Sequence, residues 1–225
     1  MAAFAAAAFL PVEGVELDVH LTKDGEVVVI HDESIHRTSN GKGYVKDYTL
    51  SELKRYDFGS WFHKRFALES IPTLREVLEL FEGSEKIVNI ELKNDVFDYP
   101  ELEEKVIEEI KRLGMEKQII ISSFNHRAIA KVARLAPQIE NAALCGKVIE
   151  NIASYQQNLP THALHVRRTI VETNSVKEAI QKGSVVRVWT VNKTKYIKDL
   201  KEAGVDAIFT DEPEKMFDYL RSLSE

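Results

Sequence analysis

The stretch Gly14-Val-Glu-Leu-Asp-Val-His20 is an apolar run interrupted by two carboxylates. Alternate side chains of a strand point to the same face, so Glu16 and Asp18 are expected to lie side by side. An unpaired charge is costly inside a buried strand, whereas paired carboxylates suit a hard divalent cation. Solvated carboxylates without a function are the alternative, but the apolar neighbours favour a metal site. The stretch therefore predicts a core strand that carries metal ligands.

The next apolar run, Val28-Val-Ile-His31-Asp32, ends in a histidine. Histidine is the side chain best suited to move protons near neutral pH, and the adjacent Asp32 can orient it or tune its charge. His31 is therefore a candidate acid/base catalyst. His20 shares the face of the two carboxylates, and we expect it to make a structural polar contact.

A third apolar run, Ile87-Val-Asn-Ile-Glu-Leu-Lys93, repeats the pattern. Glu91 and Lys93 are expected on one face of this strand. A third carboxylate would complete a hard-cation site, and the lysine could hold an anionic substrate group as a point charge. A buried Glu–Lys pair without a function is the alternative. Trp189 closes a later apolar run and is expected either to line a pocket or to belong to the core.

Apolar runs of strand length alternate with helical patterns along most of the chain. Val- and Ile-rich runs without alternation indicate strands that are covered on both faces. Gly114, Gly183 and Gly204 follow helical patterns at the position of a left-handed C-cap. Strands are expected over 14–20, 26–31, 87–92, 118–123, 141–145, 162–166, 185–191 and 206–210. Helices are expected in the Ala-rich N-terminal segment and over 73–82, 101–113, 126–136, 174–182, 194–203 and 214–223.

This alternation predicts an α/β fold with a parallel sheet and outer helices. No Gly-x-Gly-x-x-Gly follows any predicted strand, so the dinucleotide-binding open sheet lacks its signature. Polar residues at the carboxyl ends of several strands are typical of a TIM (β/α)8-type barrel. We therefore expect one catalytic barrel domain over residues 1–225, with a small insertion over about 32–71, where the strand–helix rhythm is interrupted.

The composition excludes several classes of function. The 225 residues are 44% hydrophobic and carry a net charge of −6, which argues against a nucleic-acid partner. The single cysteine, Cys145, allows no intrachain disulfide and is expected to be buried. The apolar segment 1–12 is shorter than the roughly 20 residues that span a bilayer, and no basic amphipathic surface is evident. We expect a cytoplasmic location without stable membrane association; the oligomeric state is left open.

Taken together in their order along the chain, these motifs resemble the glycerophosphodiester phosphodiesterase family. The resemblance rests on Glu16-x-Asp18, His31-Asp32, Asn40-Gly-Lys-Gly43, Gly59-Ser-Trp-Phe62, Ile71-Pro-Thr-Leu74, Asn89-Ile-Glu-Leu-Lys93, Ser122-Ser-Phe124, Trp189-Thr-Val-Asn192, and Gly204-Val-Asp206 through Thr210-Asp211. It covers nearly the whole chain and implies the barrel of the phosphodiesterase superfamily.

The resemblance implies a hydrolase that converts glycerophosphodiesters to sn-glycerol 3-phosphate and an alcohol. It assigns Glu16, Asp18 and Glu91 as ligands of Ca²⁺ or Mg²⁺ and His31 as one of two catalytic histidines. Lys93 is expected to contact the phosphate, and Trp189 to pack on the glycerol side of the pocket. Two alternatives remain at this stage: a non-catalytic metal- or phosphodiester-binding protein, and a related lipid phosphodiesterase.

The family pattern begins with a strand that ends in His-Arg-Gly and with Glu-Asn-Thr at the following helix. Met1-Ala-Ala-Phe4 corresponds to the residues directly after that tripeptide. We therefore expect this form to lack the first barrel strand, the second catalytic histidine, a phosphate-binding arginine and a further acidic site residue, and to be impaired as an enzyme. On this view the run 14–20 is the second barrel strand, and 26–31 begins the insertion hairpin.

Overall fold

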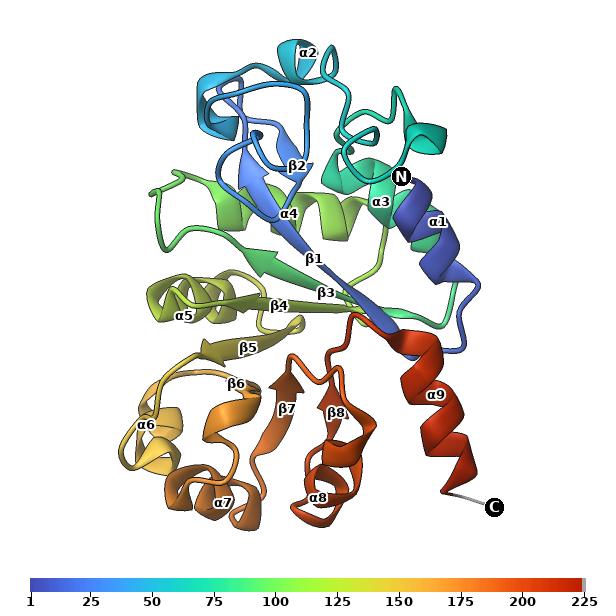
Figure 1. The fold of residues 1–225 in the computed structure, drawn as a ribbon. Helices are drawn as coiled ribbons and strands as arrows, with labels where there is room; N and C mark the ends of the chain where they lie inside the picture. The colour runs from blue at the N-terminus through green and yellow to red at the C-terminus, as the bar shows by residue number, and fades with distance from the viewer. Residues whose placement is uncertain (224–225) are drawn as a thin grey trace. The chain divides into compact units, whose positions relative to one another are not determined.

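The computed structural model describes residues 1–223, in which strands and helices alternate along the chain (Figure 1). The chain divides into two compact units. The first contains Met1–Phe9 and Glu13–Ile120; the second contains Leu10–Val12 and the chain from Ile121 onward. Strand β4 (Ile119–Ser123) crosses this boundary. The expectation of a single catalytic domain stays a prediction.

The first unit is built around strand β1 (Gly14–Leu21). Strand β2 (Val27–Val29) pairs with it antiparallel, and Val19 lies opposite Val29. Strand β3 (Ile87–Leu92) pairs with its other edge in parallel. The run 26–31 therefore contains the second strand of a hairpin, as the family resemblance implied. It is not a strand of the parallel sheet, as the apolar pattern alone had predicted.

The helices of the first unit are α1 (Ala2–Ala8), α2 (Leu50–Leu53), α3 (Leu74–Phe81) and α4 (Leu102–Arg112). Helix α3 begins at a capping box in which Thr73 and Glu76 satisfy each other's backbone N–H groups. The segment between β2 and α3 contains α2 and the 3₁₀ turns Val45–Asp47 and Lys64–Phe66. Its buried residues Ile35, Val45, Leu53 and Ile71 form a small core together with Val28 of β2.

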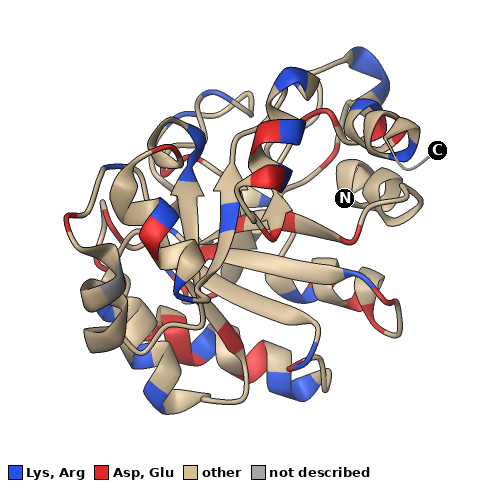
Figure 2. Ribbon diagram, turned by 90° about the horizontal axis from the view of Figure 1, so that it is seen from below, with Lys and Arg blue, Asp and Glu red and all other residues tan. Residues whose placement is uncertain are grey.

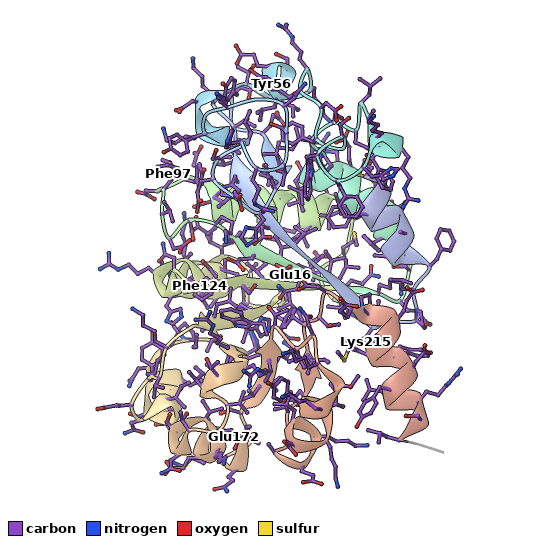
Figure 3. All side chains as sticks on the ribbon, in the orientation of Figure 1. Glu16, Tyr56, Phe97, Phe124, Glu172 and Lys215 are labelled. Carbon is purple, nitrogen blue, oxygen red and sulfur yellow. The ribbon has the colours of Figure 1, made fainter. Side chains whose placement is uncertain are left out.

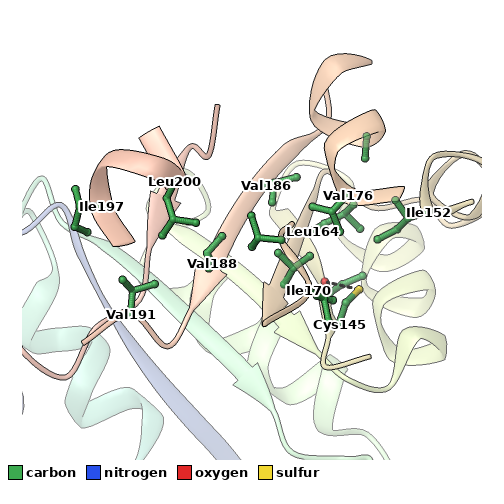
Figure 4. Packing of buried hydrophobic residues seen from close by; sticks show 14 of the residues in the cluster. Cys145, Ile152, Leu164, Ile170, Val176, Val186, Val188, Val191, Ile197 and Leu200 are labelled. Atoms are coloured by element: carbon green, nitrogen blue, oxygen red, sulfur yellow. Dashed lines mark hydrogen bonds between the residues drawn. The ribbon is translucent and has the colours of Figure 1, made fainter. Parts of the chain in front are cut away.

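The second unit contains four parallel strands in sequence order: β5 (Glu140–Cys145), β6 (Ala163–Arg167), β7 (Val185–Trp189) and β8 (Ala207–Ile208). Its helices are α5 (His126–Leu135), α6 (Ile152–Asn158), α7 (Asn174–Gln181), α8 (Ile197–Glu202) and α9 (Pro213–Ser222), with 3₁₀ turns at Arg168–Ile170 and Thr194–Tyr196. Buried aliphatic side chains of strands and helices meet in one cluster, which includes Cys145 (Figure 4).

Most element types and positions agree with the sequence prediction. Gly114, Gly183 and Gly204 have φ values of 65°, 87° and 83°, as expected for left-handed residues directly after helices. Helix α6 was not predicted, and the segment 194–203 begins as a 3₁₀ turn before it becomes α8. The charged residues lie mainly on helices and loops, and the strands are largely free of them (Figure 2). Within residues 1–223, every helix is too short or too polar to span a membrane.

Candidate active site

Three carboxylates of the first unit form a compact cluster at the β1–β3 pair. The parallel register places Asp18 opposite Glu91. Glu16, which is labelled in Figure 3, lies two residues earlier on β1. One ligating oxygen from each residue lies within 4.8 Å of the others. Asp18 and Glu91 are each only 9% exposed, whereas Glu16 is exposed. The structure thus brings together all three predicted metal ligands, and their hard oxygen donors fit a cation such as Ca²⁺ or Mg²⁺.

Lys93 lies at the carboxyl end of β3 and faces the same cluster. Its backbone N–H donates to the carbonyl of Val19 at 3.2 Å, which continues the strand pairing by one residue. Its Nζ lies 3.0 Å from Oε1 of Glu91 and 3.6 Å from Oδ1 of Asp18. The ammonium therefore sits against two carboxylates, a position from which it can contact an anion bound at the same cluster.

Burial and mutual repulsion change the protonation behaviour of this cluster. Burial raises the pKa of Asp18 despite the opposing effect of Lys93. Burial and the neighbouring Asp18 raise the pKa of Glu91. Burial acts to lower the pKa of Lys93, but Glu91 and Asp18 outweigh it and hold that pKa above its usual value. The cluster is therefore an energetically costly concentration of negative charge, as expected of a site that holds a cation.

His31 lies beside this cluster at the end of β2. The backbone N–H of Ile30 donates to the carbonyl of Asp18 at 3.0 Å, which fixes the end of the hairpin next to the carboxylates. The His31 ring nitrogen Nδ1 lies 2.7 Å from Oδ1 of Asp32. Two nitrogens of Arg37 donate to the same carboxylate, which holds the pKa of Asp32 well below its usual range. An ionised carboxylate only accepts, so Nδ1 of His31 carries the proton.

His20 has the structural role expected of it, with a partner that sequence reasoning missed. Its Nδ1 lies 3.1 Å from the hydroxyl of Tyr99, and its Nε2 lies 3.3 Å from the backbone carbonyl of His31. Burial lowers the pKa of His20 to about 4. The neutral ring therefore donates from Nε2 to the His31 carbonyl and accepts the Tyr99 proton at Nδ1. No periodicity links Tyr99 to this contact, because it lies in the loop after β3.

Trp189 belongs to the second unit, at the end of β7. Its Nε1 donates to the carbonyl of His165 at 3.0 Å, its ring meets that of Phe124 edge-on, and the guanidinium of Arg167 lies 5.8 Å from the ring centroid. The indole is therefore held in a defined orientation at a strand's carboxyl end. Its predicted contact with substrate stays a prediction.

The chain is similar to known phosphodiesterases over almost its full length. The model of the glycerophosphoryl diester phosphodiesterase family matches residues 1–215. A glycerophosphodiester phosphodiesterase from Caldanaerobacter subterraneus subsp. tengcongensis is 41% identical over 223 residues, covering 98% of this chain and 91% of the relative. One from Bacillus altitudinis is 43% identical over 218 residues, covering 96% of this chain and 89% of the relative.

Solved structures show the same similarity in three dimensions. An Oleispira antarctica phosphodiesterase in complex with the product sn-glycerol-3-phosphate has a TM-score of 0.89 and is 28% identical, covering 98% of this chain and 90% of that one. A glycerophosphodiester phosphodiesterase from Thermotoga maritima has a TM-score of 0.73 and is 29% identical, covering 95% of this chain and 87% of that one. The predicted family and the α/β TIM-type fold are confirmed.

Proposed function

Because the chain belongs to the glycerophosphoryl diester phosphodiesterase family, we propose that it hydrolyses glycerophosphodiesters to sn-glycerol 3-phosphate and an alcohol. The observation that carries the proposal is the cluster of Glu16, Asp18 and Glu91 with Lys93 against it. Carboxylates repel a phosphodiester unless cations offset their charge, so the cluster suits this substrate only with a bound metal. The small-molecule substrate is a proposal that the product complex of the Oleispira antarctica relative supports.

We propose that Glu16, Asp18 and Glu91 hold one divalent cation, Ca²⁺ or Mg²⁺. When bound, the cation supplies positive charge that polarises a phosphoryl oxygen and offsets the charge that develops on it. Lys93 lies on the same face and would contact another phosphoryl oxygen as a fixed point charge. The lysine thereby orients the phosphate and also limits the repulsion between the two buried carboxylates.

His31 is the proposed acid/base residue of this site. Asp32 holds the proton on Nδ1, so Nε2 is the nitrogen that exchanges a proton with substrate. In the proposed reaction, one histidine removes the proton of the neighbouring glycerol hydroxyl, which attacks phosphorus, and a second one protonates the leaving alkoxide. Water then opens the resulting cyclic phosphate with the two roles exchanged. We also propose that Trp189 contacts the glycerol moiety.

We further propose that the 225-residue chain by itself turns over slowly. Among the described residues, His31 is the histidine that follows the Ile30–Asp18 backbone contact and has an exposed side chain. His20, the other histidine nearby, is fully buried and held between Tyr99 and a backbone carbonyl. Within residues 1–223 we therefore assign a dedicated catalyst to one of the two proton transfers, and a lost acid/base group costs about 10²–10⁴-fold in rate.

The experiment is a glycerophosphocholine hydrolysis assay on the purified chain, with coupled detection of sn-glycerol 3-phosphate. Release of this product that stops with EDTA and returns with Ca²⁺ or Mg²⁺ would support the proposal. A His31→Ala chain, with the cation cluster intact, separates acid/base catalysis from cation binding. Absence of any product in the presence of excess cation, while the chain still binds that cation, would favour the non-catalytic binding protein instead.

A further inference from the structure

Arg37 holds the carboxylate that orients His31. Its Nε donates to Oδ2 of Asp32 at 2.7 Å and its Nη2 donates to Oδ1 at 2.8 Å, so the guanidinium takes both oxygens of one carboxylate. Oδ1 of Asp32 also accepts from Nδ1 of His31 at 2.7 Å. One carboxylate thus links an arginine to the candidate acid/base histidine.

This arrangement contributes little to the stability of the folded protein. The side chains of His31 and Arg37 are 66% and 56% exposed, and that of Asp32 is 26% exposed. Exposed ion pairs stabilise proteins by only about 0–1 kcal/mol. The arrangement does, however, constrain orientation: a planar guanidinium that takes two oxygens fixes the plane of the carboxylate, which a single hydrogen bond does not.

The backbone of His31 is held by a separate contact. His20 donates to the His31 carbonyl, and Tyr99 in turn holds His20. The main chain of His31 is therefore held by a partly buried contact, and its imidazole ring is held by Asp32. The remaining freedom is rotation of the Asp32 carboxylate, and this is the motion that the two bonds from Arg37 remove.

We propose that Arg37 is a positioning residue for the reaction: through Asp32 it fixes the ring orientation and the Nδ1–H tautomer of His31, which leaves Nε2 available for proton transfer. The inference rests on the proposed role of His31 in phosphodiester hydrolysis. Arg37 does not need to contact substrate in this role. Its effect should therefore appear in kcat and depend on the presence of Asp32.

The test compares Arg37→Gln, Arg37→Lys, Asp32→Asn and the double variant with the unaltered chain in the glycerophosphocholine assay. We expect Arg37→Gln to lower kcat by about tenfold, the lower end of the loss found when the outer partner of a metal-binding side chain is removed, with little change in KM. Arg37→Lys keeps the charge but not the paired donors, so its kcat should lie between those of the unaltered chain and Arg37→Gln. Because Arg37 acts through Asp32, the double variant should be no slower than Asp32→Asn.

Arg55 provides the matched control, since it is an exposed arginine in the same insertion. Arg55→Gln should leave kcat unchanged, and all variants should keep the thermal midpoint and the Ca²⁺ affinity of the unaltered chain. A loss of activity with a lowered midpoint would show that Arg37 serves folding and would overturn the proposal. Additive losses in the double variant would equally overturn it, because Arg37 would then act independently of Asp32.

A second readout does not depend on turnover. Nitrogen-15 NMR of the histidine rings, with His31→Gln to assign the signal, reports which nitrogen carries the proton. We expect the neutral ring to be protonated at Nδ1 in the unaltered chain and to become a tautomer mixture in Arg37→Gln. An unchanged tautomer in Arg37→Gln would overturn the inference. If the chain shows no hydrolysis at all but the tautomer changes as expected, the proposed function fails while the positioning contact stands.

Discussion

Lys93, the residue directly after β3, forms an ion pair of 3.0 Å with Glu91 of that strand, and the same ammonium is also 3.6 Å from Asp18. The side chains of the pair are each only 12% exposed. This contact gives the lysine two functions in the same place. It compensates buried negative charge in the folded protein and presents positive charge where a phosphate is expected to bind.

Removal of the positive charge of Lys93 should destabilise the cation-free protein. Lys93→Met leaves two buried carboxylates without their cation, and breaking a buried ion pair costs about 3–5 kcal/mol. We expect the free energy of unfolding in EDTA to fall by about 3–5 kcal/mol and to recover partly when Ca²⁺ or Mg²⁺ is added. Urea unfolding with and without the cation measures both effects.

The exposed Lys198 supplies the control for this experiment. Its Nζ lies 3.9 Å from Glu202 one helical turn away, and both side chains are well exposed. Lys198→Met should change the free energy of unfolding by less than about 0.5 kcal/mol. If Lys93→Met behaved like Lys198→Met, the lysine would not be compensating the carboxylates.

Asp18→Asn is predicted to stabilise the cation-free protein while it weakens cation binding. Burial raises the pKa of Asp18 above its value in the unfolded chain, so the ionised form disfavours folding at neutral pH. Asparagine has the same shape but no charge, so it removes this penalty. We expect the free energy of unfolding in EDTA to rise by about 1 kcal/mol, as is common for single stabilising substitutions. Thermal unfolding in EDTA and calorimetric titration with Ca²⁺ measure the two opposite effects on one variant.

Glu16→Gln separates binding from stability. Glu16 is exposed although it belongs to the same cluster, so its charge carries a much smaller desolvation cost than those of Asp18 and Glu91. We expect a loss of cation affinity of at least about tenfold, the loss found even for residues that only support a metal ligand, with an unchanged free energy of unfolding in EDTA. Unchanged affinity for both Ca²⁺ and Mg²⁺ would remove Glu16 from the ligand set.

The sequence was sufficient to find the carboxylates because charged residues inside apolar strand patterns are conspicuous. Glu16, Asp18 and Glu91 interrupt runs of Val, Ile and Leu, and alternation alone assigns them to faces. The proximity of the three carboxylates in the folded chain could not be predicted from the residues alone. It depends on the parallel register between β1 and β3, which sets Asp18 opposite Glu91 across more than 70 residues of chain.

The residues that surround His31 were harder to find for a related reason. Arg37 and Tyr99 lie in irregular segments, where no period relates a side chain to its partner. Only the folded backbone brings Tyr99 to His20 and bends the chain so that Arg37 reaches Asp32. Helix α6 was missed because its sequence, Ile152-Ala-Ser-Tyr-Gln-Gln-Asn158, offers few apolar positions at helical spacing.

A final prediction concerns acid stability and rests on His165 of β6. Burial, with a smaller contribution from the adjacent Arg187, lowers the pKa of this histidine to about 3. Its Nε2 accepts from Nη1 of Arg187 at 3.2 Å, which requires the neutral ring. The folded protein therefore keeps His165 neutral in a range where the unfolded chain protonates it.

The sign of the effect follows from proton counting. Below the ordinary histidine pKa of about 6.5, the unfolded state binds a proton that the folded state does not, so the free energy of unfolding falls as pH decreases. One such group contributes a slope of about 1.4 kcal/mol per pH unit between roughly pH 6 and pH 4. His165→Gln should reduce the slope by that amount, measured by urea unfolding at a series of pH values. An unchanged slope in His165→Gln would mean that the buried ring is protonated in the folded protein.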